Sequence, residues 1–159
     1  MPGLLKGSTL ISSDFKDILS AFDVQGVDYL VVGAHAMAFH GVARATGDID
    51  LWVKCNVANS EKVYKALVDF GAPMVDVNKS DFEIPGTVYQ IGVAPHRIDI
   101  LTAIDGVVFD EAFAARETVN INGFTIPVIS KHHLIENKNT VRRPQDLVDV
   151  QLLKKTENE

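Results

Sequence analysis

Residues 48–53 read Asp-Ile-Asp-Leu-Trp-Val, and this stretch decides how we expect the chain to fold. Its apolar residues at alternate positions would form the core face of a strand. Asp48, Asp50 and Trp52 would share the opposite face. The pattern therefore predicts a buried strand that carries two carboxylates close together on its reverse.

The segments on both sides of this strand predict the rest of the fold. Helical spacing, caps and stop signals predict helices at 14–25 (with Ser13 as N-cap), 35–41, 60–70 (after Asn59 or Ser60 as cap), 110–115, 131–141 and 144–155. Apolar runs predict strands at 29–32, 87–91 and 97–101, and a hairpin at 119–128 around Asn122-Gly123. We expect one α/β (α+β) domain over residues 1–159, in which helices pack on a mixed sheet, the C-terminus is helical, and residues 1–12 form a loose lead-in.

Composition limits the classes of function. The 159 residues carry a formal net charge of −6, which disfavours an extended nucleic-acid surface. Cys55 is the only cysteine, so no internal disulfide can form. The chain shows neither a signal-peptide pattern at its start nor an apolar run of ~20 residues, so we expect a cytoplasmic protein without a membrane partner.

A third carboxylate comes from the segment Arg97-Ile98-Asp99-Ile100-Leu101. Alternation places Asp99 on the face opposite the two isoleucines, together with Arg97. If this strand neighbours the strand of Asp48 and Asp50, three carboxylates converge. An arginine capping all three and leaving no room for an ion would remove the basis for a cation site.

Carboxylates held this close repel one another unless a cation binds between them. Oxygen ligands on a rigid sheet suit Mg²⁺ or Mn²⁺ better than zinc. Such a site can support phosphoryl or nucleotidyl transfer, which needs mainly positioning and charge neutralisation. The alternative is that these aspartates only decorate a solvated sheet face.

The turn Gly33-Ala34-His35 lies where a buried strand meets a helix. Glycine lets the backbone approach a ligand, and free N–H groups at a helix start can bind phosphate. A plain tight turn, with His35 simply packed, is the alternative. Arg44 could pair with a phosphate or, equally, with a carboxylate of the protein.

Two segments, 31–35 and 44–51, together resemble the signature of the polymerase-β-like nucleotidyltransferase superfamily: an apolar strand, a glycine turn on a helix and a later Asp-x-Asp strand. Residues 97–101 resemble the third carboxylate strand of that superfamily. The tail from Ile129 to Asp149 is similar to the end of a bacterial subgroup related to abortive-infection-type toxins. The resemblance spans roughly residues 29–153, nearly the whole chain.

This resemblance implies roles for individual residues. Asp48, Asp50 and Asp99 would be catalytic and would bind Mg²⁺ or Mn²⁺, with Asp99 also the base for the acceptor hydroxyl. The residues implied to contact the nucleoside triphosphate are Gly33, Ala34, His35, Arg44, Thr46 and Lys138. Ala34 departs from the pattern, because many active members have glycine or serine there.

Lys138 shares a helical stripe with Leu134, so we expect it to point towards the protein body. Its partner would be the nucleotide or, equally, Asp146 or Asp149.

The main functional hypothesis is metal-dependent transfer of a nucleoside monophosphate from an NTP to a hydroxyl, with release of pyrophosphate. Two alternatives stay open: a catalytically silent binding protein of a toxin–antitoxin or regulatory pair, with a cognate partner protein, and a metal-dependent phosphohydrolase. The sequence does not identify the acceptor, which could be a protein, an RNA end or a small molecule.

Overall fold

The computed structural model describes residues 12–44, 47–121 and 123–156 of the chain. Of the expected lead-in, residues 1–11 lie outside these ranges. No helix within them is both long and apolar enough to cross a membrane.

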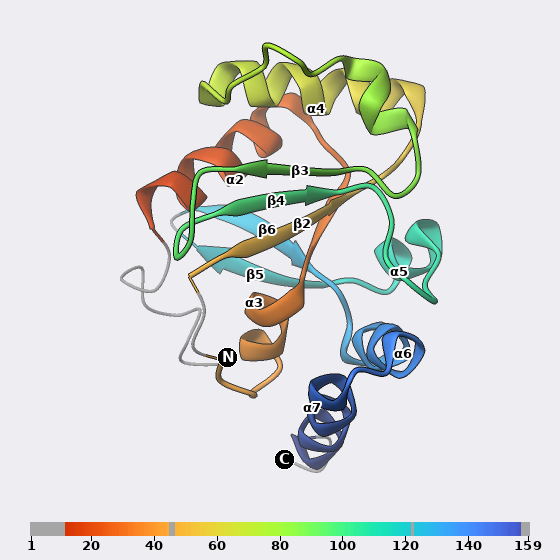
Figure 1. Ribbon diagram of the computed structural model, residues 1–159. Helices are drawn as coiled ribbons and strands as arrows, with labels where there is room; N and C mark the ends of the chain where they lie inside the picture. The colour runs from red at the N-terminus through yellow and green to blue at the C-terminus, as the bar shows by residue number, and fades with distance from the viewer. Residues whose placement is uncertain (1–11, 45–46, 122, 157–159) are drawn as a thin grey trace.

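The centre of the fold is a six-stranded mixed sheet with the strand order β3-β4-β2-β1-β6-β5 (Figure 1). Its strands are β1 (Tyr29–Val32), β2 (Ile49–Val53), β3 (Val88–Ile91), β4 (Ile98–Leu101), β5 (Glu117–Ile121) and β6 (Phe124–Val128). Strand β2 is antiparallel to β1 and parallel to β4, while β1 is parallel to β6. The predicted α/β class, with a mixed sheet and packed helices, is confirmed.

Burial explains why these segments became strands. All four residues of β1 are buried, as expected for a continuous apolar run in the middle of a sheet. In β2 the predicted core residues Ile49, Leu51 and Val53 are at most 2% exposed. The hairpin β5–β6 forms as predicted, and Gly123 takes the positive φ that its turn requires.

Helices cover both sides of the sheet. In the view of Figure 1, α2 and α4 lie together above the strands, and α3, α6 and α7 lie below them. The helices are α2 (Ser13–Gln25), α3 (Gly33–Phe39), α4 (Val57–Phe70), α5 (Phe109–Ala114), α6 (Lys131–Val141) and α7 (Pro144–Lys155), with a 3₁₀ helix η2 (Lys79–Glu83) between α4 and β3. Both C-terminal helices have the predicted bounds.

Two predicted caps were wrong. Helix α2 is capped by Ser12 rather than Ser13, and α4 by Asn56 rather than by Asn59 or Ser60. Asn59 is buried inside α4, where its side chain bonds the backbone of neighbouring loops at Asp28 and Lys54. Tertiary hydrogen bonds therefore use this side chain, and the true cap lies three residues earlier.

Candidate active site

The sheet brings the three predicted carboxylates together. Strands β2 and β4 are parallel neighbours, and Asp50 lies directly opposite Asp99 in their register. Adjacent strands are ~4.8 Å apart, so two side chains on the same face at this register are in direct reach of each other. Asp48 precedes β2, and its Oδ1 accepts a hydrogen bond of 3.0 Å from the backbone N–H of Arg97.

The pKa of Asp50 reflects how close the carboxylates lie to one another. Burial, followed by the charge of Asp99, a hydrogen bond with Asp99 and the charge of Asp48, raises the pKa of Asp50 to about 7. Near neutral pH, Asp50 is therefore partly protonated, and added positive charge would favour its ionised form. A cation bound among these carboxylates would relieve their mutual repulsion.

Arg97 supplies part of the missing positive charge. Its Nε and Nη2 bond both oxygens of Asp99 at 2.7 and 3.1 Å, and Nη2 lies 3.4 Å from Oδ2 of Asp48. The same contacts raise the pKa of Arg97, led by its hydrogen bond to Asp99. The guanidinium thus bridges two of the three predicted ligands.

Arg97 does not neutralise the cluster. One guanidinium faces three carboxylates, and the pKa of Asp50 stays raised despite it. The Arg97 side chain is 31% exposed and long enough to swing towards solvent. The donor set consists of hard oxygens on adjacent strands, which fits Mg²⁺ or Mn²⁺ once the guanidinium moves aside.

The turn at Gly33 is pressed against Asp50. Gly33 begins α3 with a φ of +69°, and a Cβ placed there would lie 2.2 Å from Oδ2 of Asp50. Only glycine fits, for both its backbone conformation and this close approach. The turn and the carboxylate site are therefore one structural unit, and Ala34 follows in the same turn.

His35 packs inward from this turn. It is 7% exposed, its ring meets Phe15 edge-on at 5.6 Å, and it hydrogen-bonds the backbone of Asp48. Burial lowers its pKa, and Asp48 opposes the shift. The packed histidine weighed as the alternative is thus what the structure shows, and this contact positions the start of the acidic strand.

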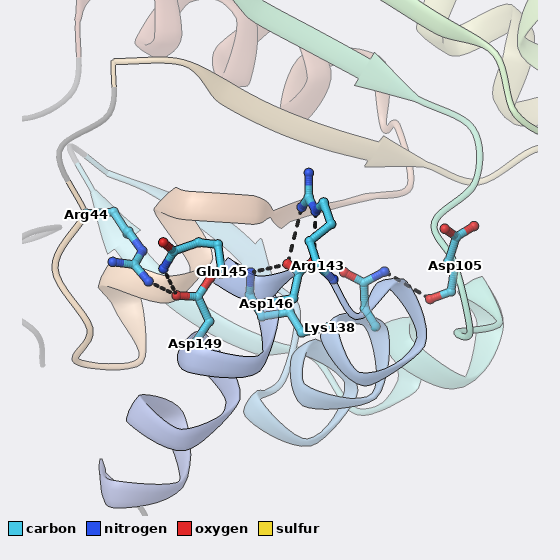
Figure 2. A network of polar contacts seen from close by, with 8 residues as sticks. Arg44, Asp105, Lys138, Arg143, Gln145, Asp146 and Asp149 are labelled. Atoms are coloured by element: carbon cyan, nitrogen blue, oxygen red, sulfur yellow. Dashed lines mark hydrogen bonds and ion pairs between the residues drawn. The ribbon is translucent and has the colours of Figure 1, made fainter.

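Arg44 and Lys138 belong to a buried ionic network between the segment before β2 and the last two helices. Lys138 is 2.8 Å from Asp149 and 3.4 Å from Asp146, and Arg44 pairs with Asp149. Figure 2 shows Arg44 and Gln145 meeting at Asp149, and Arg143 at Asp146. The predicted alternative partners of Lys138 are therefore present.

Electrostatics shows what this network does. Desolvation lowers the pKa of Lys138, and the Arg143 guanidinium holds the pKa of Asp146 below its usual range. Asp146 also accepts from the backbone N–H of Arg143, which starts α7. The network connects α6 and α7 to the loop that leads into Asp48. It therefore helps to hold this loop, and with it Asp48, in position.

Two features of the segment 44–47 need separate mention. Thr46, a predicted nucleotide contact, lies outside the described residues. Gly47 was not predicted to matter, yet a Cβ there would lie 1.7 Å from the carbonyl oxygen of Pro95. This close contact between two loops sets Asp48 beside Arg97, and a Gly immediately before Asp-x-Asp is the sequence signal that could have indicated it.

A separate group of ligand atoms lies at the start of α6. Nitrogen or oxygen atoms of His132, His133 and Glu136 lie within 4.8 Å of one another. His132 and Glu136 are largely exposed and form an (i, i+4) pair of 3.3 Å. This is the arrangement of a surface ion pair on one helical turn.

The fold and the three converging carboxylates define the class: the chain has a nucleotidyltransferase fold. Solved structures agree. The lincomycin-bound lincosamide antibiotic adenylyltransferase LnuA superposes with a TM-score of 0.59 at 20% identity, covering 91% of this chain and 97% of that one. A proposed nucleotidyltransferase from Thermotoga maritima gives 0.55 at 15% identity, covering 90% and 89%. No family model and no curated protein matches the sequence.

Proposed function

We propose that this protein is a nucleotidyltransferase that uses Mg²⁺ or Mn²⁺ to transfer a nucleoside monophosphate from an NTP to a hydroxyl group. The observation that carries the proposal is the pairing of Asp50 with Asp99 across β2 and β4, with Asp48 two residues before Asp50 and bonded to the backbone N–H of Arg97. A raised pKa at such a cluster is typical of functional carboxylates.

The reaction forms one bond and breaks one. The acceptor oxygen attacks the α-phosphorus, the bond from this phosphorus to the bridging oxygen breaks, and pyrophosphate leaves. Asp99 accepts the hydroxyl proton, since it is buried and faces Asp50 across the strands. The bound divalent ion supplies charge neutralisation for the triphosphate and for the leaving group.

Other residues position these groups. The Gly33 turn lets the backbone approach the phosphates beside Asp50. Asp48, Asp50 and Asp99 would hold the divalent ion, and Arg97, which now bonds Asp99 and lies near Asp48, would pair with a phosphate oxygen instead. Arg44 and Lys138 are paired with Asp149 and Asp146, so they would contact the nucleotide only if these ion pairs opened.

Calorimetric titration of Mn²⁺ with ATP, CTP, GTP and UTP tests the proposal. We expect at least one NTP to bind only with the metal, and Asp48→Asn and Asp99→Asn to abolish this binding. The exposed Asp76→Asn is the matched control and should bind like wild type. Equal NTP binding by all variants, or no metal-dependent NTP binding by wild type, would refute the proposed metal and nucleotide site. Product analysis separates transfer from hydrolysis, because a phosphohydrolase leaves free nucleotide.

A catalytically silent member of a toxin–antitoxin or regulatory pair is the second candidate. Two observations favour it: Arg97 already occupies a cation position between Asp48 and Asp99, and Ala34 replaces the usual glycine or serine. The Arg97→Gln variant distinguishes the two. An enzyme whose arginine is displaced by metal should bind Mn²⁺ severalfold more tightly after this change, whereas a site built around the arginine should lose stability and gain no metal.

The abortive-infection-type subgroup, a cognate partner protein and a cytoplasmic setting remain parts of this proposal. The tail that carries the subgroup resemblance is the one that forms the Lys138 network. A small antibiotic is one candidate acceptor, because LnuA, which shares the fold, is a lincosamide adenylyltransferase.

A further inference from the structure

The row of side chains that contains Asp50 and Asp99 continues onto the edge strand of the sheet. Strand β3 is this edge strand and pairs with β4 on the side away from β2 (Figure 1). In their antiparallel register, Gln90 of β3 lies directly opposite Asp99. Side chains directly opposite one another leave the same face of a sheet, with Cβ atoms about 4.5–5.5 Å apart. Asp99 therefore lies between Asp50 on one side and Gln90 on the other.

The Gln90 side chain is available to a ligand. It is exposed, and its carboxamide makes no hydrogen bond within the part of the chain that the structure describes. Asp99, by contrast, is only 7% exposed, so a molecule that reaches Asp99 from the side of β3 passes the Gln90 carboxamide. A carboxamide both donates and accepts hydrogen bonds, which suits a hydroxyl group as its partner.

The next row of side chains on this face is apolar. Val88 lies opposite Leu101 in the same register, two residues along β3 from Gln90 and thus ~7 Å away. Val88 is 56% exposed, and Leu101 is half-buried. A molecule with a hydroxyl at Asp99 therefore meets a polar amide beside that hydroxyl and an apolar surface one row farther along the strands.

We propose that Gln90 selects the acceptor, a small molecule with two adjacent hydroxyl groups on an apolar body. One hydroxyl gives its proton to Asp99 and its oxygen bonds the α-phosphorus as pyrophosphate leaves. The neighbouring hydroxyl hydrogen-bonds the Gln90 carboxamide, which gains and loses no proton, and the body contacts Val88 and Leu101. The inference rests on the proposed function and narrows its acceptor to a small diol. An RNA end also carries adjacent hydroxyls, but its phosphates would meet a chain with a net charge of −6.

A comparison of two ring alcohols as acceptors tests the role of Gln90. The probes are cis-1,2-cyclohexanediol and cyclohexanol, which share an apolar ring and differ by one hydroxyl. With Mn²⁺ and the NTP that binds, mass spectrometry of the nucleoside monophosphate esters gives kcat/KM for each probe. We expect wild type to favour the diol about 3- to 10-fold per hydroxyl, the effect of one neutral hydrogen bond. Gln90→Leu, which removes the polar atoms at similar size, should erase this preference.

A matched control separates the position from the kind of substitution. Gln151→Leu makes the same change at an exposed position of α7, far along the chain from the sheet, and should keep the wild-type preference for the diol. Gln90 is exposed on an edge strand, so Gln90→Leu should fold, and its melting temperature checks this.

The outcomes separate this inference from the proposed function. If Mn²⁺ and NTP bind, then an equal diol preference in wild type and Gln90→Leu, or no transfer to the diol by wild type, would overturn the inference alone. Loss of Mn²⁺ and NTP binding in Gln90→Leu would also overturn it, because Gln90 would then serve the metal or the nucleotide. Faster transfer to a short RNA with a free 3′ end than to the diol at equal concentration would refute the small-molecule acceptor. No metal-dependent NTP binding by wild type would overturn the proposed function, and this inference with it.

Discussion

Replacing Asp50 by asparagine should stabilise the metal-free protein at pH 8, although it removes a predicted metal ligand. The carboxyl of Asp50 has its pKa raised from 3.8 to about 7, chiefly by burial and by Asp99. The folded state therefore holds this proton more tightly than the unfolded state. Stability from this group is complete below pH ~4, falls as the pH rises through 7, and is absent at pH 8.

The magnitude follows from the shift. The shift of about three pKa units corresponds to a ceiling of ~4 kcal/mol, and solvent screening at the partly exposed cluster reduces this to about 2 kcal/mol. For a chain of this size that is ~4–8 °C in Tm. Asparagine keeps the shape of the Asp50 side chain, carries no charge and can donate a hydrogen bond to Asp99. The variant therefore avoids the cost of ionising a buried carboxyl at pH 8.

Thermal unfolding in EDTA at pH 8 and at pH 4.5 is the assay. We expect Asp50→Asn to raise Tm at pH 8 and to have a much smaller effect at pH 4.5, while Asp76→Asn changes neither. Adding Mn²⁺ at pH 8 should then raise Tm of wild type more than that of the variant. A variant that is less stable than wild type at pH 8, or equally shifted at both pH values, would refute this account of the cluster.

Two further substitutions test how the site is supported. Lys138→Met should lower the free energy of unfolding by about 2–3 kcal/mol, or ~4–12 °C in Tm, because it leaves two buried carboxylates with fewer partners. The exposed Lys154→Met on α7 is its control, and equal melting temperatures of the two variants would contradict a structural role. Gly33→Ala should abolish Mn²⁺ binding measured by calorimetry, because its Cβ displaces the adjacent carboxylate, and should cost ~1–2 kcal/mol in backbone strain. Gly26→Ala has the same φ of +69° in open space, so it should share the strain and keep the metal, and loss of metal in both would point to general misfolding.

Much of the fold could be predicted because its signals are local. Alternation in residues 48–53 gave β2 and placed Asp48 and Asp50 on one face, and the Asn122-Gly123 turn gave the hairpin. Helices α6 and α7 were bounded correctly, since Pro144 marks the start of the second. These features depend on neighbours within a few residues, which the sequence displays directly.

The caps show where local signals fail. Asn56, Asn59 and Ser60 are all chemically able to cap α4. Asn56 caps the helix, because the side chain of Asn59 is hydrogen-bonded to the backbone of Asp28 and Lys54, two residues outside the helix. No pattern within the helix itself carries that information.

By itself, the sequence determined which residues could form the site: three carboxylates on two strands, and a glycine turn that leads into them. Only the tertiary structure decided that β4 lies beside β2, so that Asp50 faces Asp99, and that Arg97 bridges Asp48 and Asp99. The physical reason is that strand order and side-chain partners depend on residues far apart in the chain, brought together by burial of the common core.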